Sequence, residues 1–162
     1  GITAISIYLI LYLTMNLGVF LFILNMQRDQ INVTKIKDLS GLYKTEPVMA
    51  GCLAIILFSM AGIPPLAGFV GKLLILNVVV DSNLFFLAVI AVLTSVIAAF
   101  YYIRMVKSIF FDEPTEELDI LTNNQSKLLM ILFSFFNLTV ILYPQFFLNL
   151  SASIALSLFA LK

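Results

Sequence analysis

The segment Gly62-Ile63-Pro64-Pro65-Leu66-Ala67-Gly68 interrupts the longest apolar run of this sequence, residues 48–80. As one straight helix these 33 residues would be roughly 50 Å long, although a bilayer core needs only about 20 residues. Pro64 and Pro65 both lack a backbone N–H group and cannot sit in an uninterrupted helix. We therefore predict two half-helices, roughly 48–61 and 66–80, joined by an unwound segment. The predicted hinge residues are Gly62, Pro64, Pro65 and Gly68.

The composition of the whole chain is that of a membrane protein. Of its 162 residues, 62% are hydrophobic and 11% are charged, compared with roughly 45–50% and 25% in soluble domains. The apolar runs predict an all-α membrane protein with one membrane domain, residues 1–162, and four transmembrane helices. The expected spans are 2–26, 48–80 (broken), 84–103 and 128–146. A tail helix at 147–161 either lies at the membrane interface or extends the fourth span.

Several functional classes are excluded by the charged and metal-binding residues. Nine Lys and Arg balance nine Asp and Glu, so the chain lacks the basic surplus that nucleic-acid binding needs. Without His and with a single Cys, it offers no usual zinc, haem or iron–sulfur site and no disulfide within itself. We expect no catalytic residue, no cofactor site and no metal site.

The positive charges predict the orientation of the chain in the membrane. Four spans put the loops 27–47 and 104–127 on one side, and the turn 81–83 and both termini on the other. The first side carries seven cationic residues and the second only Lys162. The seven are Arg28, Lys35, Lys37, Lys44, Arg104, Lys107 and Lys127. By the positive-inside rule, the two loops face the cytoplasm or the mitochondrial matrix.

Lys72 is the charged residue that lies inside an apolar run. It is nine residues from Asp81, and therefore roughly 13 Å of helix from the nearest membrane surface. A lysine at the bilayer centre costs roughly 2.5–3.5 kcal/mol, so such residues usually face a bundle interior or water and serve an ion pathway. Carbonyls freed by the neighbouring break can hold water or orient the ammonium. Lys72 is thus the predicted proton-translocating residue; the alternative is that it snorkels, or pairs with an acid of another chain, and only fastens the helix.

Asn16 in the first span is a candidate for polar support of the site. Its amide either pairs with backbone freed by the break or bonds a neighbouring helix. We expect Gly68 and Gly71 to allow close approach of helices, and Cys52 to be a small buried hydrophobic residue.

Two motifs give the sequence a family resemblance. The first is Ser59-Met60-Ala61-Gly62-Ile63-Pro64-Pro65-Leu66-Ala67-Gly68-Phe69 followed by Gly71-Lys72, and the second is Tyr101-Tyr102-Ile103-Arg104-Met105-Val106-Lys107 running on to Phe111-Asp112-Glu113-Pro114. With both, the chain resembles the C-terminal part of subunit 2 of respiratory NADH:ubiquinone oxidoreductase (complex I), an antiporter-like subunit. Either motif alone also fits a cation/proton antiporter.

The resemblance implies a fold and a role. The four spans would correspond to helices 11–14 of a fourteen-helix subunit, and Lys72 to the lysine of the proton half-channel nearer the positive side of the membrane. The chain would be a non-redox subunit of the H⁺-translocating NADH:ubiquinone reductase, without NADH, flavin or cluster. Its membrane would be the mitochondrial inner membrane or, alternatively, the bacterial plasma membrane.

The resemblance also implies partners. Ten upstream helices of the family are missing here, so we expect a separately encoded or cleaved half that docks onto a chain supplying them, beside other membrane-arm subunits and lipid. Otherwise those helices, and transport with them, have been lost. Two other functions stay open: a subunit of a cation/proton antiporter complex, and a scaffold that conducts no protons.

Overall fold

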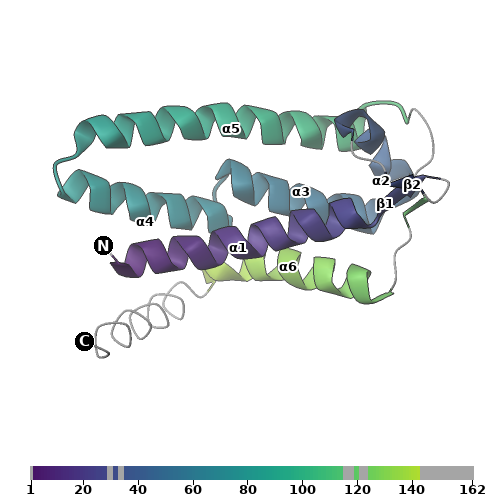
Figure 1. The fold of residues 1–162 in the computed structure, drawn as a ribbon, viewed down its shortest axis with the longest axis horizontal. Helices are drawn as coiled ribbons and strands as arrows, with labels where there is room; N and C mark the ends of the chain where they lie inside the picture. Colours follow the sequence, from purple (N-terminus) through teal and green to yellow (C-terminus); the bar gives the residue numbers. More distant parts are fainter. Residues whose placement is uncertain (1, 29–30, 33–34, 115–118, 121–123, 143–162) are drawn as a thin grey trace.

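The computed structural model is a bundle of helices that lie side by side along one long axis (Figure 1). It describes residues 2–28, 31–32, 35–114, 119–120 and 124–142. In chain order the elements are α1 (Ile2–Leu24), β1 (Met26–Arg28), β2 (Ile31–Asn32), the 3₁₀ helix η1 (Ile36–Leu39), α2 (Leu42–Thr45), α3 (Pro47–Ala61), α4 (Ala67–Asp81), α5 (Phe85–Phe111), β3 (Asp119–Ile120) and α6 (Asn124–Leu142). The predicted helical class is confirmed, with strands of only two or three residues between the described helices.

The predicted break in the second apolar run is present. α3 ends at Ala61, and Gly62 follows in the left-handed region that favours glycine, with φ of 85°. The Gly62 N–H donates to the carbonyls of Phe58 and Ser59, which closes the last turn of α3. α4 begins at Ala67, after the two prolines. The half-helices therefore match the predicted ranges to within one residue at each end.

α3 lies at the centre of the bundle, because α1, α4, α5 and α6 all pack against it. Most side chains of α3 are buried, and four of the less buried residues, Val48, Gly51, Ile55 and Phe58, form one narrow stripe at helical spacing. The most buried are Met49, Ala50, Leu53, Ile56, Leu57 and Ser59. α1 instead buries one stripe at helical spacing, formed by Ala4, Ile7, Leu11, Met15, Gly18 and Phe22. The end of α3, where the chain breaks, is consequently held by its neighbours.

The outer helices carry the membrane signal. Within the described residues, α1 and α5 are long and apolar enough to cross a membrane by themselves. α5 lies along the outside of the bundle (Figure 1), and most of its large apolar side chains are exposed. The number of crossings and the domain bounds stay predictions. The end of the fourth predicted span and the tail 147–161 lie outside the described residues.

The third predicted span, 84–103, coincides with the first part of a longer helix, α5. α5 continues through Tyr101, Arg104 and Lys107 to Phe111 without interruption. The predicted span ends where the first charged residues follow the apolar run, but charged residues do not end a helix. The next residue that cannot continue it is Pro114, just beyond the observed end.

The two long loops meet at one end of the bundle, as their predicted common side requires. β1 pairs antiparallel with β2 and with β3, in the order β2-β1-β3, so the loop after α1 is joined to the loop after α5. The Gly41 N–H donates to the Ser108 carbonyl at 3.1 Å, and Lys44 Nζ lies 2.9 Å from Glu113 Oε2. The described part of the loop 27–47 contains η1, α2 and the antiparallel pair of β1 and β2.

Candidate functional site

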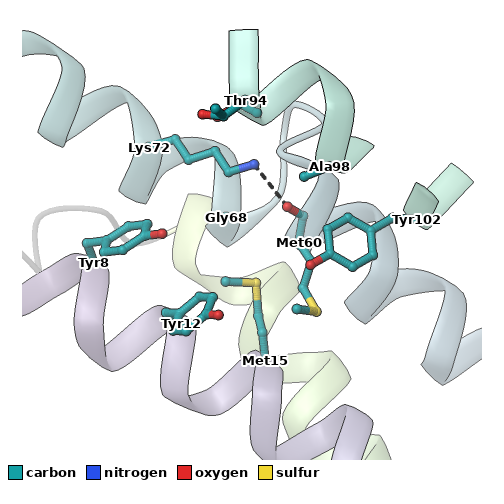
Figure 2. Close-up of a pocket in the computed structure, with 10 residues that line it drawn as sticks. Tyr8, Tyr12, Met15, Met60, Gly68, Lys72, Thr94, Ala98 and Tyr102 are labelled. Carbon is teal, nitrogen blue, oxygen red and sulfur yellow. Dashed lines mark hydrogen bonds between the residues drawn. The ribbon is translucent and has the colours of Figure 1, made fainter. Parts of the chain in front are cut away.

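The Lys72 side chain bridges the break. Lys72 lies one turn into α4, and its chain reaches back to the end of α3 (Figure 2). Its Nζ donates to the carbonyl of Met60 at 3.0 Å and to the carbonyl of Ala61 at 3.2 Å. The last carbonyls of a helix have no partner within the helix and carry the negative end of its dipole. The carbonyls at the end of α3 therefore stabilise the positive charge of the Lys72 ammonium.

The hinge residues shape this place in different ways. A Cβ at Gly62 would lie 3.2 Å from Lys72 Nζ and 3.1 Å from its Cδ, so the glycine leaves room for the lysine as well as making the turn. Pro64 and Pro65 lie exposed in the connecting segment. Gly68 lies in the first turn of α4 and is buried. Gly62 and Gly68 thus touch the site, and the prolines form the break itself.

Gly68 and Gly71 let helices approach closely, as predicted from the sequence. A Cβ at Gly68 would overlap the backbone carbonyl of Ser59, so the start of α4 touches the end of α3. A Cβ at Gly71 would lie 3.3 Å from Tyr8 and 3.4 Å from Leu11, both on α1. α4 therefore packs closely against both α3 and α1.

A cavity of about 250 Å³ lies beside Lys72, between α1, α4 and α5. Tyr8 and Tyr12 of α1 and Tyr102 of α5 direct their hydroxyl groups into it (Figure 2). The rest of the wall is formed by Met15, Met60, Gly68, Thr94, Ser95 and Ala98. A second cavity of about 230 Å³ borders Lys72 from the side of Leu73, Leu76 and Val92 and is mostly apolar. Lys72 thus lies between a polar and an apolar space.

Within the described part of the chain, no carboxylate lies within 4.0 Å of the Lys72 ammonium. Ion pairs in that part of the chain lie elsewhere and join Lys44 to Glu113, Lys107 to Asp112 and Lys127 to Glu46. Backbone carbonyls are its hydrogen-bond acceptors instead. Nor do three or more His, Cys, Asp or Glu side chains of the described residues gather where they could hold a metal ion. An amine in this position can bind a proton and release it.

The hydrogen bond of Asn16 stays within its own helix and joins neither the break nor a neighbouring helix. Its amide donates to the carbonyl of Tyr12, one turn earlier in α1, at 2.8 Å. The polar side chains at the break are Ser59 and Asn137, both fully buried, whose Oγ and Oδ1 atoms are 2.9 Å apart. Neither residue was predicted from the sequence. The available signal was the same as for Asn16, an amide inside the apolar run that begins at Leu128, but it does not reveal which helix the amide faces.

Comparison with known proteins places this geometry in a family. Residues 1–98 match the family described as NADH:quinone oxidoreductase/Mrp antiporter, transmembrane. NADH-quinone oxidoreductase subunit N of Rhodospirillum rubrum is 50% identical over 131 residues, which cover 81% of this chain and 27% of that protein. Subunit N of Beijerinckia indica is 42% identical over 162 residues, covering 98% and 33%. The chain spans about a quarter to a third of these relatives.

Solved structures share the fold. A chain of respiratory complex I from Thermus thermophilus, solved with bound aureothin, superposes with a TM-score of 0.81 at 24% identity, covering 92% of this chain and 34% of that one. A chain of the Mrp complex from Dietzia sp. DQ12-45-1b gives a TM-score of 0.78 at 24% identity, covering 93% and 36%. On the family match and the sequence identities, this chain belongs to the NADH:quinone oxidoreductase/Mrp antiporter family of membrane proteins.

Proposed function

We propose that this chain is part of the proton-translocating membrane arm of respiratory complex I, and that Lys72 binds and releases a proton in transit. In this proposal the oxidation of NADH by ubiquinone takes place in other subunits, and the chain catalyses no reaction by itself. The observation that carries the proposal is the position of the Lys72 ammonium, between the last carbonyls of α3 and a cavity lined by tyrosine hydroxyls.

A lysine that carries a proton inside a membrane must be stabilised when charged and must also reach a proton path. The carbonyls of Met60 and Ala61 supply the stabilisation, because they lie at the negative end of a helix dipole. The cavity of about 250 Å³ has room for several water molecules, each of which occupies about 30 Å³ in the liquid. Tyrosine hydroxyls donate and accept hydrogen bonds, so water in this cavity would link Lys72 to Tyr8 and Tyr102.

Two alternatives have support of their own. The fold of the Mrp complex chain supports a subunit of a cation/proton antiporter complex. The names of the sequence relatives, NADH-quinone oxidoreductase subunit N, favour complex I. From the two sequence motifs we infer that the chain corresponds to part of subunit 2 of that complex. A scaffold role without proton conduction is the third reading, and it requires that Lys72 only fasten α4 to α3.

The exposed break supports a partner that supplies the missing part of the subunit. Pro64 and Pro65 lie exposed although the break interrupts an apolar run, and irregular backbone at membrane depth persists only against protein or water. We propose that this face meets helices of the upstream part of the subunit, on the same or a separate, split-encoded chain, beside other membrane-arm subunits and lipid. The bacterial relatives favour the plasma membrane over the mitochondrial inner membrane.

The test is the variant Lys72→Met, studied in membrane vesicles that contain the whole complex. Methionine keeps an unbranched side chain but cannot carry a proton, so we expect fewer protons pumped per NADH oxidised. Lys107→Met is the matched control, because Lys107 lies on α5 with an exposed side chain, 3.5 Å from Asp112; it should pump normally. Pumping is followed with a pH-sensitive dye, and assembled complex is quantified on a native gel stained for NADH dehydrogenase activity.

Each outcome selects one of the three functions. Reduced pumping by Lys72→Met at normal assembly supports the proton site. Normal pumping with normal assembly leaves the scaffold role. If mass spectrometry finds the wild-type chain outside the active band, beside antiporter-like chains and without redox subunits, the antiporter function replaces complex I.

A further inference from the structure

The Ser59 hydroxyl bonds outside its own helix, unlike most serine and threonine hydroxyls in the described helices. A serine or threonine inside a helix usually donates to a carbonyl one turn earlier in its own helix. Six hydroxyls in or at the end of the described helices do so, namely those of Thr14, Thr45, Ser82, Thr94, Ser134 and Thr139. Ser59 instead donates out of α3 to Asn137 Oδ1 on α6, at 2.9 Å. Something outside α3 therefore sets its rotamer.

The hydrogen bonds of the Asn137 amide keep the Ser59 hydroxyl in this orientation. Its side chain is fully buried, and its Nδ2 donates to the carbonyl of Phe133 at 2.8 Å, one turn earlier in α6. This second bond fixes the plane of the amide and turns Oδ1 toward Ser59. Both ends of a buried amide are thus satisfied, as the cost of an unpaired buried polar group requires.

The orientation of Ser59 matters at the start of α4. Because the Ser59 hydrogen points to Asn137, its lone pairs are free to accept the Gly68 N–H, at 3.0 Å. Gly68 lies in the first turn of α4, where backbone N–H groups have no partner within the helix. A chain of hydrogen bonds consequently runs from α6 through α3 to α4, entirely among buried groups.

We propose that Asn137 and Ser59 are positioning residues for Lys72, and this inference rests on the proton role proposed above. Lys72 lies one turn after Gly68, on the same face of α4. The two carbonyls that accept from Lys72 belong to the residues directly after Ser59. The hydrogen bonds of Ser59 therefore fix the position of α4, which carries Lys72, relative to the carbonyls of Met60 and Ala61.

Removing the hydrogen bonds of Ser59 should weaken the contacts of the Lys72 ammonium with the Met60 and Ala61 carbonyls without removing the lysine. Asn137→Leu replaces the amide by an apolar group of similar size, and Ser59→Ala removes a single oxygen atom. In Asn137→Leu the Ser59 hydroxyl loses its buried acceptor, and in Ser59→Ala the Gly68 N–H loses its buried acceptor. We expect each to reduce about fivefold the part of proton pumping that Lys72→Met abolishes. The double variant should be no worse than either single one, because both break the same chain of bonds.

Ser134→Ala is the matched control. Ser134 is buried on α6, one turn before Asn137, and its hydroxyl bonds the Cys52 carbonyl of α3 at 3.1 Å, away from the break. It also links α6 to α3, so it measures what a lost α6–α3 bond does in general. Ser59→Thr keeps the hydroxyl and should restore pumping relative to Ser59→Ala, and the pH dependence of pumping should change in Ser59→Ala but not in Ser134→Ala.

The outcomes separate this inference from the proposed function. If Lys72→Met pumps normally, the proton role itself fails. If Lys72→Met loses pumping while Asn137→Leu and Ser59→Ala match Ser134→Ala in pumping and pH dependence, only the positioning role is overturned. If Asn137→Leu does not assemble, Ser59→Ala and Ser59→Thr decide. Loss of assembly in both Asn137→Leu and Ser59→Ala, but not in Ser134→Ala, assigns these bonds to assembly and also overturns the positioning role.

Discussion

At the scale of single residues, two glycines in the broken run have opposite surroundings. A Cβ at Gly68 would overlap the Ser59 carbonyl, whereas a Cβ at Gly51, in the middle of α3, meets no atom within 4 Å. Gly68 also supplies the N–H that Ser59 accepts. The contact between the half-helices thus requires that Gly68 have no side chain. Nothing in the described structure requires this of Gly51.

Gly68→Ala should destabilise the protein, and Gly51→Ala should not. Overpacking a tight contact costs about 1–3 kcal/mol and sometimes more, and here the obstacle is backbone that cannot rotate away. At Gly51, alanine is the better helix former by up to about 1 kcal/mol. The measurement is the temperature at which half of the assembled complex, stained on a native gel, is lost. Equal temperatures for the two variants would contradict the close approach seen at Gly68.

What the sequence reveals at this scale depends on the range of the interaction. Pro64, Pro65 and Lys72 are recognisable locally, because a proline breaks any helix and a charge in an apolar run is anomalous wherever it lies. The bond between Ser59 and Asn137 joins residues 78 positions apart. Whether an amide such as Asn16 or Asn137 faces the break depends on the rotation of its helix in the bundle, which the apolar pattern of these helices does not encode.

At the scale of elements, the segments that connect the helices at one end form an ordered layer. The Ser40 and Ser108 hydroxyls lie 3.1 Å apart and join the end of η1 to α5. The ion pair of Lys127 with Glu46 connects the start of α6 to the start of α3, at 3.2 Å. Such pairs contribute little individually, about 0–1 kcal/mol near the surface. The sequence predicted that these loops share a side, but not their pairing, since strands of two or three residues leave no periodic signal.

A cross-link tests this layer. In a Cys52→Ala background, Ser40→Cys combined with Ser108→Cys should form a disulfide on mild oxidation, because the two oxygens that the sulfurs replace are 3.1 Å apart. Ser40→Cys with Ser95→Cys is the control, since Ser95 lies 13 residues earlier in α5, roughly 20 Å along the helix. Mass spectrometry of the joined peptides reads the result. Equal cross-linking in both pairs, or in neither, would mean that η1 does not lie against this end of α5.

At the scale of the whole molecule, the helices separate two ends of different chemistry. The end with β1, η1 and α2 carries the loops rich in Lys and Arg, and the opposite end carries the turn between α4 and α5 and the start of α1 (Figure 1). Lys72 lies between them, in the apolar part of the bundle. Under the proposed function, a proton that passes Lys72 would move between these two ends, and the direction of transport would depend on which compartment each end faces.

The excess of cationic residues predicts that orientation, which accessibility measurements can check. In a Cys52→Ala background, Lys37→Cys marks the loop end and Ser82→Cys marks the turn between α4 and α5; both positions are exposed. By the positive-inside rule, a maleimide that cannot cross membranes should label Lys37→Cys only in inverted vesicles and Ser82→Cys only in right-side-out ones. The opposite labelling would reverse the orientation, so that each end of the bundle would face the other compartment. Labelling of both positions from one side would mean that the chain does not cross the membrane between them, which would remove the basis for a proton path through Lys72.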